Sequence, residues 1–166
     1  MSETTWIAGI EEQLKGKLNL DATALDLNAD IPTLTLKRDN VIAAIALLKE
    51  SGFNFLTDLT GIHYPQLKGS ELGVIYHLHD MVKNHRLRLK VFVSISDPTV
   101  PTLTELFPGA NWMERETFDF FGIHFKGHPN LKRILNMDEM NYHPMRKEYQ
   151  LEDGQREDKD NSMFGR

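Results

Sequence analysis

The sequence predicts an α+β protein of two layers, in which helices pack on a mixed, mostly antiparallel sheet. Three consecutive strand-like runs, residues 53–64, 72–80 and 86–96, are joined by short loops, which predicts an antiparallel meander. The last run alternates apolar and basic residues, so one side would face a core and the other solvent. Segments with helical spacing of apolar residues stand before and after these strands. The 166 residues are enough for one domain with a real core.

The elements before the meander are expected to be shorter. Apolar residues recur at every fourth position over residues 6–18, which predicts a first amphipathic helix. Residues 24–28 and 33–36 are expected to form strands around the turn "NADIP". Asp39 or Asn40 can then cap a second helix with one apolar face.

Two helices are expected after the meander. Thr102 and Glu105 form the pattern of a capping box, which predicts a short helix at that point. Asn111 and Glu114 repeat the pattern at the start of a longer helix, and Gly122 can close it.

The longer helix carries charged residues among aromatic ones. At about 100° per residue, its apolar side consists of Trp112, Met113 and Phe120. Glu116 projects into the middle of that side, while Arg115 and Asp119, four positions apart, are expected to pair. A carboxylate on an apolar side must find a cation, find donors or become protonated. Glu116 is therefore a general acid or, favoured because no nucleophile or second carboxylate accompanies it, a structural ion pair. The bases available downstream are Lys132, Arg133 and Arg146.

The histidines offer a metal site as an alternative. His77 and His79 are two positions apart on a strand, so both rings lie on one face, and His63 could be a third ligand. Exposed strand histidines are the favoured interpretation, because seven histidines in this length give such a pair easily by chance. The histidines expected to shape later loops are His124, His128 and His143.

Composition and motifs speak against several classes of function. The sequence has no cysteine, which excludes disulfides, thiol nucleophiles and thiolate-bound metal clusters. A formal net charge of −5 disfavours nucleic-acid binding, and there is no glycine-rich nucleotide loop. The longest apolar run, residues 41–48, is too short for a membrane span, and the first residues resemble neither a secretory signal nor a transit peptide. For the basic strand face, a solvated surface is favoured over a site for phosphate or acidic protein; its residues are Arg86, Arg88 and Lys90.

The chain is expected to form a single α+β domain over residues 1–144 and a charged tail over residues 145–166. The tail, "MRKEYQLEDGQREDKDNSMFGR", has few apolar anchors and cannot bury much surface alone. We expect it to extend along a partner protein.

One long stretch is similar to a known family. Residues 114–135, "ERETFDFFGIHFKGHPNLKRIL", resemble the signature of the C subunit (NuoC family) of proton-pumping NADH:quinone oxidoreductase, respiratory complex I. The stretches "LTDLTGIHYP", "VIYHL", "NHRLRLKV" and "HPMRKEY" also look like this family and stand in the right order. The matching positions are Glu114, Arg115, Glu116, Asp119, Phe120, Phe121, His128, Lys132, Arg133, Ile134, Leu135, His143, Pro144, Arg146 and Lys147.

The sequence departs from the family pattern at a few positions. Tyr142 stands for a glycine and Gln150 for a proline, which leaves the path of the tail open. Met145 and Glu148 replace leucine and aspartate conservatively. His63 stands where an aspartate is usual, so no role of that carboxylate is transferred.

The resemblance implies a function that the residues alone do not reach. It implies a peripheral-arm subunit with a structural and assembly role, packed against the D subunit near the quinone site and beside other peripheral-arm subunits. It implies that the signature residues are structural or interface residues, and that this chain binds no cofactor or metal. FMN, iron–sulfur clusters and quinone would be bound elsewhere in the complex. The chain would lie on the cytoplasmic face of the cell membrane, held there only through the complex.

Two alternatives stay open. One is the equivalent domain of a membrane-bound hydrogenase or of a ferredoxin-dependent NDH complex, where the electron donor differs. The other is a stand-alone enzyme that uses Glu116 with a histidine for acid–base chemistry, or a metal bound at His77 and His79.

Overall fold

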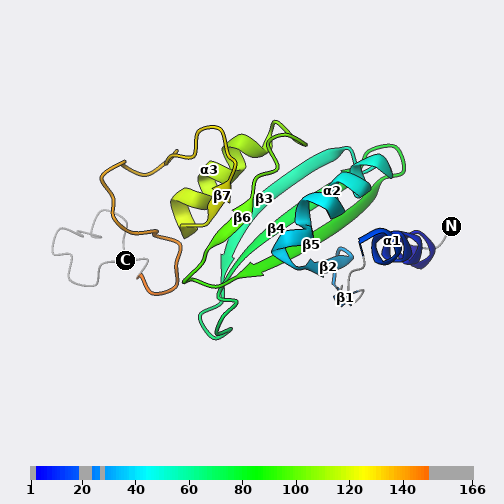
Figure 1. Cartoon of the computed structure of the whole chain (residues 1–166), viewed down its shortest axis with the longest axis horizontal. Coiled ribbons are helices and arrows are strands. Elements are labelled where there is room, and N and C mark those ends of the chain that lie inside the picture. Colours follow the sequence, from blue (N-terminus) through cyan, green and yellow to red (C-terminus); the bar gives the residue numbers. More distant parts are fainter. Residues whose placement is uncertain (1–2, 19–23, 27–28, 150–166) are drawn as a thin grey trace, which may run out of the picture.

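The computed structural model describes residues 3–18, 24–26 and 29–149. A five-stranded sheet runs through this part of the chain (Figure 1). Its strands are β1 (Ala24–Asp26), β2 (Thr33–Leu36), β3 (Phe55–His63), β4 (Leu72–Asp80) and β5 (His85–Val93). They lie in the order β1-β2-β5-β4-β3, and only β2 and β5 pair in parallel. The predicted mixed, mostly antiparallel sheet and its central meander are confirmed.

Helices cover one face of this sheet (Figure 1). The helices of the described ranges are α1 (Glu3–Leu18), α2 (Val41–Glu50) and α3 (Ala110–Phe121), with a short 3-10 turn, η1 (Arg38–Asn40), before α2. A separate parallel pair, β6 (Thr99–Pro101) and β7 (His124–Lys126), flanks α3. The predicted α+β class is therefore confirmed. No helix in the described ranges is long and apolar enough to cross a membrane.

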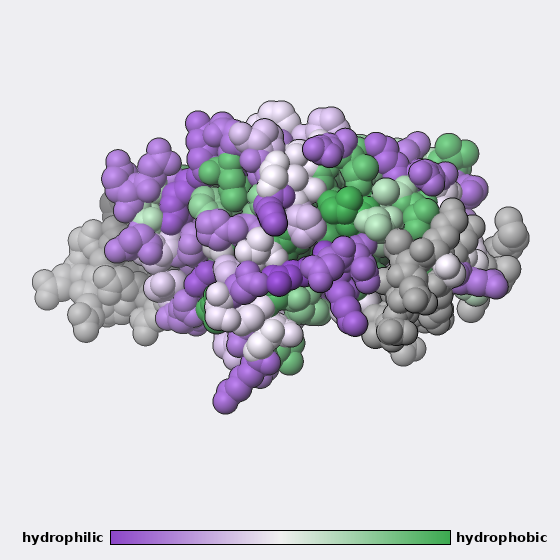
Figure 2. Space-filling view, in the orientation of Figure 1, coloured by the Kyte–Doolittle hydropathy of each residue, from purple (hydrophilic) through white to green (hydrophobic). Residues whose placement is uncertain are grey.

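The core lies between the sheet and the helices. Strand β5 alternates as predicted, and the side chains that it buries are Leu87, Leu89, Val91 and Val93. α2 buries a matching side made of Val41, Ala44, Ile45 and Leu48. Each fully buried aliphatic side chain of this size contributes about 1.5–3 kcal/mol of hydrophobic stabilisation. On the helix-covered surface, hydrophobic patches interrupt the hydrophilic residues (Figure 2).

Glycine determines how closely α3 approaches the sheet. Gly61 in β3 lies under the ring of Phe121, and a Cβ atom at this position would overlap that ring. The absence of a side chain lets the aromatic ring lie directly on the strand. Gly122 ends α3 with φ at +73°, in the left-handed region, so the predicted helix end is confirmed.

Two capping predictions are wrong, and a third is half right. Residues 102–107 form turns rather than a helix. The Thr102 hydroxyl accepts the Thr104 N–H at 3.2 Å as a cap would, but Pro108, which cannot continue a helix, follows after one turn. α3 begins one residue before Asn111, so Asn111 lies within its first turn and does not cap it. Asn40 does occupy the N-cap of α2, but its side chain makes no capping hydrogen bond.

Two predicted segments extend beyond the described residues. The strand expected over residues 24–28 is β1 as far as Asp26, and the rest lies outside the described residues. The tail expected from residue 145 is described as far as Tyr149. The division into a domain and a tail stays a prediction.

Candidate functional site

The signature residues lie on α3 and on the segment after β7, residues 127–149, here called the strap. The strap contains no helix or strand and passes beside α3 (Figure 1). Asn111, Arg115 and Asp119 are four positions apart, so they share one side of α3, and each holds the strap. The Asn111 carbonyl lies 3.1 Å from Nε2 of His128. The Arg115 guanidinium donates at 3.2 and 2.9 Å to two strap carbonyls, those of Lys132 and Arg133.

Asp119 is the most heavily used of these anchors. Its side chain is fully buried, and Arg133 donates to Oδ1 at 2.6 Å. Oδ2 accepts three consecutive strap N–H groups, from Ile134, Leu135 and Asn136, at 2.9–3.1 Å. Burial alone would raise the pKa of Asp119, but these amide and guanidinium donors hold it well below its usual range. The carboxylate is therefore a structural anion whose acceptor capacity is taken up by the strap.

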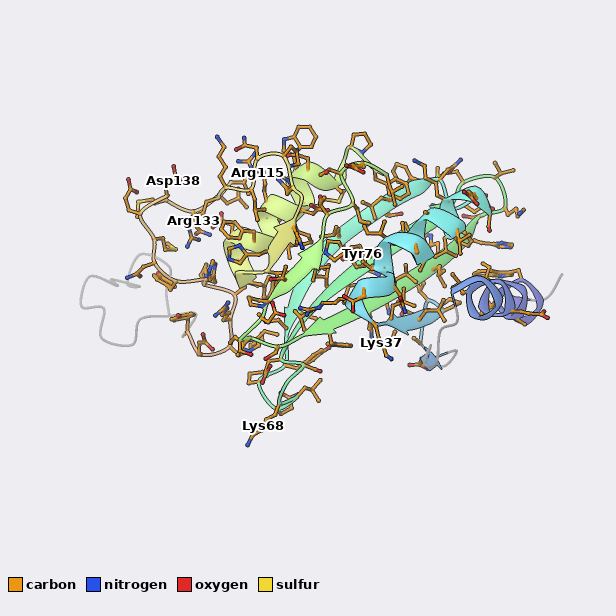
Figure 3. The ribbon with its side chains drawn as sticks, in the orientation of Figure 1. Lys37, Lys68, Tyr76, Arg115, Arg133 and Asp138 are labelled. Atoms are coloured by element: carbon orange, nitrogen blue, oxygen red, sulfur yellow. The ribbon has the colours of Figure 1, made fainter. Side chains whose placement is uncertain are left out.

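Arg133 connects Asp119 of α3 to a later part of the strap, residues 140–142. Besides Asp119, its guanidinium donates to the carbonyls of Met140 and Tyr142 at 2.6 and 2.9 Å. Its side chain is 9% exposed, so one guanidinium satisfies acceptors from three parts of the chain in a largely dry environment. Figure 3 shows Arg115 and Arg133 beside α3, with Asp138 at the outer bend of the strap.

Residues 143–146 of the strap cap the C-terminal end of α3. Met145 donates its N–H to the Phe120 carbonyl at 3.1 Å, and Arg146 donates from Nε to the Phe121 carbonyl at 2.7 Å. The last carbonyls of a helix have no partner within the helix, so these bonds satisfy groups that would otherwise be orphaned. Nδ1 of His143 lies 2.9 Å from the Asp119 carbonyl and completes this end.

The strap also contacts the sheet, through a bond between Lys147 and His63. The side chain of His63 is 6% exposed, and its Nδ1 accepts the N–H of Lys147 at 2.9 Å. Burial lowers the pKa of His63, which favours the neutral ring that an acceptor nitrogen requires. His63 is therefore part of the anchor of the strap.

A second buried carboxyl lies under α3. Glu114 is fully buried; it accepts the Thr102 hydroxyl at 2.5 Å and the Leu103 N–H at 2.6 Å. No cation pairs with it within the described residues, and burial raises the pKa of Glu114 to about 7. The nearby hydroxyl of Tyr76 is buried without a described hydrogen-bond partner, and burial raises the pKa of Tyr76 as well.

Comparison with known proteins shows the family to which this chain belongs. The family described as "Respiratory-chain NADH dehydrogenase, 30 Kd subunit" matches residues 34–155, which include the sheet from β2 onward, α3 and the whole strap. The chain belongs to this family. The C subunit of the NADH-quinone oxidoreductase of Moorella thermoacetica is 44% identical over 124 residues, covering 74% of this chain and 82% of the relative. The C subunit of Caulobacter vibrioides is 43% identical over 136 residues, covering 82% of this chain but 62% of the relative.

Solved structures support the same family fold. The trypsin-resistant fragment (1-134) of Nqo5 has 30% sequence identity and a TM-score of 0.66, covering 75% of this chain and 98% of that chain. A chain of the membrane-bound sulfane sulfur reductase, an archaeal respiratory membrane complex, superposes with a TM-score of 0.73 over 88% of this chain and 86% of that chain. Its identity of 22% shows a shared fold only.

Within this family fold, the predicted orientation of α3 is wrong. Glu116 is exposed, and Trp112, expected on the buried side, is 60% exposed. The buried positions of α3 are Ala110, Glu114, Thr117, Asp119 and Phe121. Arg115 does not pair with Asp119. It donates to strap carbonyls instead, because the fold of the strap places the Arg133 guanidinium next to Asp119. An ion pair between an α3 carboxylate and a downstream base does exist, but the carboxylate is Asp119.

The three strand histidines do not converge. His77 and His79 lie on the sheet face away from the helices, whereas His63 is buried on the helix-covered face. Arg88 donates to Nε2 of His77 at 2.8 Å, and Nδ1 of His77 lies 3.6 Å from Asp58. The described residues contain no group of histidine and carboxylate side chains that could hold a metal ion.

The strap exposes large apolar side chains among charged ones such as Lys132, Asp138 and Glu139. Its exposed large apolar side chains are Leu135 (66%), Met137 (69%), Tyr142 (38%), Met145 (43%) and Tyr149 (38%). Because Asp119 of α3 and Arg133 bond the strap from beneath, these exposed apolar side chains are held in place on α3. Such a surface is chemically inert but suited to a protein partner.

Proposed function

We propose that this chain is a peripheral-arm subunit of a proton-translocating NADH:quinone oxidoreductase, with a structural and assembly role next to the D subunit and the quinone site. The relatives, which are C subunits of NADH-quinone oxidoreductases, support this proposal. The chain spans about half to two thirds of the length of most of them. The observation that carries it is the strap, where buried ionic bonds hold exposed apolar side chains in place.

The charged signature residues Asp119 and Arg133 hold the strap in place rather than take part in a reaction. Asp119 and Arg133 have their hydrogen-bonding capacity taken up by each other and by backbone groups. Glu116, the candidate general acid, is exposed and has no positioned partner within the described residues. A stand-alone acid–base enzyme built on Glu116 therefore lacks its geometric basis.

In this role the chain would help electrons pass from NADH to quinone without carrying them. FMN and the iron–sulfur clusters would be held by other subunits, since a sequence without cysteine has no thiolate for a cluster. The chain would reside at the cytoplasmic face of the cell membrane through its contacts with the D subunit and neighbouring subunits. A membrane-bound hydrogenase or ferredoxin-dependent complex is separated from this proposal by the electron donor of the purified assembly.

A tagged full-length chain, made in the cells that naturally contain it, tests the proposal. The wild-type chain is expected to co-purify with a membrane complex that oxidises NADH with quinone. Met137→Glu on the strap should lower recovery of the complex on the order of 10-fold, because a charge would be buried in the interface. Met81→Glu is the matched control, since Met81 is also a strongly exposed methionine, in the β4–β5 turn at 59%.

Two results would contradict the proposal. The first is a wild-type chain that purifies without partner subunits. The second is a Met137→Glu chain that recovers as much complex as the Met81→Glu control while both variants retain the circular dichroism of the wild type.

A further inference from the structure

The five-stranded sheet has a second face that none of the described helices covers. α2 and α3 both pack on the face that carries the buried side chains of β5, and α1 contacts α2. The opposite face, here called the open face, is formed by the alternate residues of β2 to β5. Its central positions are Thr60, Ile62, Ile75, His77, Lys90 and Phe92.

The centre of the open face is apolar. Strand register places Phe92 opposite Gly73, and Gly73 opposite Ile62. Ile62 and Phe92 close over the glycine, since an added Cβ would lie 3.0 Å from each. Ile75 is next to Gly73 on the same face of β4, and all three large apolar residues are half-buried. A sheet face that meets only water usually carries polar residues at its centre, so this one is unusual.

A basic stripe runs along one side of this centre. Arg86, Arg88 and Lys90 alternate along β5, and Lys37 follows β2 in extended backbone. Arg88 is engaged, because it donates to His77 at 2.8 Å and to Asp30 at 3.1 Å. The other three have no ion pair within the described part of the chain. In the described ranges, the carboxylates beside this stripe are Asp58, next to His77, and Asp30, which pairs with Arg88. Four cations against these two leave the open face basic on a chain whose formal net charge is −5.

We infer that the open face binds a second protein subunit of the complex, through a surface that combines carboxylates with an apolar centre. The inference rests on the proposed function and adds a docking surface distinct from the strap. Carboxylates of the partner would pair with Lys90 and Arg86, and its apolar side chains would cover Ile75 and Phe92. The chain would then join two neighbours, one at each surface.

The dimensions of the face agree with such a contact. Each of the strands β3, β4 and β5 has nine residues. Three strands of this length form a surface about 30 Å long and about 15 Å wide. With the neighbouring four-residue β2, the flat area is about 500 Å² before its projecting side chains are counted, and a standard interface buries roughly 800 Å² per partner.

Site-specific crosslinking can identify the partner because the chain has no cysteine of its own. Thr60→Cys places a single thiol on the open face, and Met137→Cys places one on the strap. Each full-length variant is labelled with a maleimide benzophenone, assembled into the membrane complex, irradiated and digested for mass spectrometry. The open-face label is expected to crosslink to an acid-rich peptide of a subunit other than the one reached from the strap.

A charge reversal provides an independent measurement. Lys90→Glu should lower the recovery of that second subunit on the order of 10-fold at low salt, with a smaller effect at high salt. Lys68→Glu is the matched control, because Lys68 lies at the tip of the projecting β3–β4 loop (Figure 3). The subunit reached from the strap should be retained in both variants.

Several outcomes would overturn the inference. The first is a Thr60→Cys label that crosslinks only to a second copy of this chain. The second is a label that crosslinks only to residues 150–166 of its own chain. The third is a label that crosslinks to nothing while the strap label does crosslink. A Lys90→Glu chain that retains every subunit as well as the Lys68→Glu control also overturns it. The proposed function fails separately, if neither label reaches another subunit because the wild-type chain is not in a complex.

Discussion

Replacing Glu114 by glutamine should stabilise the protein above neutral pH and stabilise it much less near pH 5. Glutamine has nearly the same shape, so it can accept the Leu103 N–H with its oxygen and donate to the Thr102 hydroxyl with its amide. The hydrogen bonds that Glu114 makes would therefore be retained. What the substitution removes is the cost of ionising a fully buried carboxyl without a paired cation.

The pKa of Glu114 gives the direction and size of this effect. Below pH 4.5 the carboxyl is protonated in both the folded and the unfolded state. Between pH 4.5 and about 7 the unfolded chain loses this proton while the folded protein retains it, so the free energy of unfolding falls as pH rises. Above pH 7 the loss is complete, and it corresponds to about 3 kcal/mol. The glutamine variant should be more stable than the wild type by up to that amount at pH 8.

Urea unfolding of the full-length proteins, followed by circular dichroism from pH 5 to pH 8, measures this difference. Other titrating groups, such as His63 and Asp119, are common to both proteins and cancel when the two are subtracted. Glu116→Gln is the matched control, because it makes the same substitution at an exposed position of the same helix. A Glu114→Gln difference that is the same at pH 5 and pH 8 would refute the reasoning.

Two further substitutions test the anchor of the strap and the seating of α3. Asp119→Ala leaves Arg133 and three strap N–H groups without their acceptor, so the free energy of unfolding should fall by about 3–5 kcal/mol in urea titrations; a loss below about 1 kcal/mol would mean that the strap does not depend on Asp119. Gly61→Ala forces a methyl group into the Phe121 ring and should cost about 1–3 kcal/mol, measured as a lower melting temperature. Adding Phe121→Leu should recover part of that loss, and no recovery would contradict the proposed contact.

The sheet was predictable because its signal is local. In β5 apolar and basic residues alternate from Arg86 to Val91, and this alternation determines both the strand and its two faces. The short loops between β3, β4 and β5 leave little choice except antiparallel neighbours. The parallel pairing of β2 with β5, by contrast, depends on how η1 and α2 lead the chain from β2 into the meander, for which no local pattern exists.

The orientation of α3 was not predictable from its spacing, since large apolar residues lie all around the helix. The sheet determines which of them is buried. Gly61 in β3 leaves room for Phe121, so Trp112 on another side of the helix stays exposed. The small residues Ala110 and Thr117 were the weak signal for the buried side. Asp119 is buried only because the strap folds over it, and its bond to Arg133 joins residues 14 positions apart through irregular backbone.

Hydrogen exchange of the chain alone and in the purified membrane complex tests most directly whether the strap is the surface that joins the complex. The N–H groups of Ile134, Leu135 and Asn136 already bond Asp119, so they should exchange slowly in both samples. Residues 137–142, at the outer bend, should exchange quickly in the isolated chain and become protected in the complex. Equal exchange of residues 137–142 in both samples would contradict the proposal that the strap carries the chain into its complex.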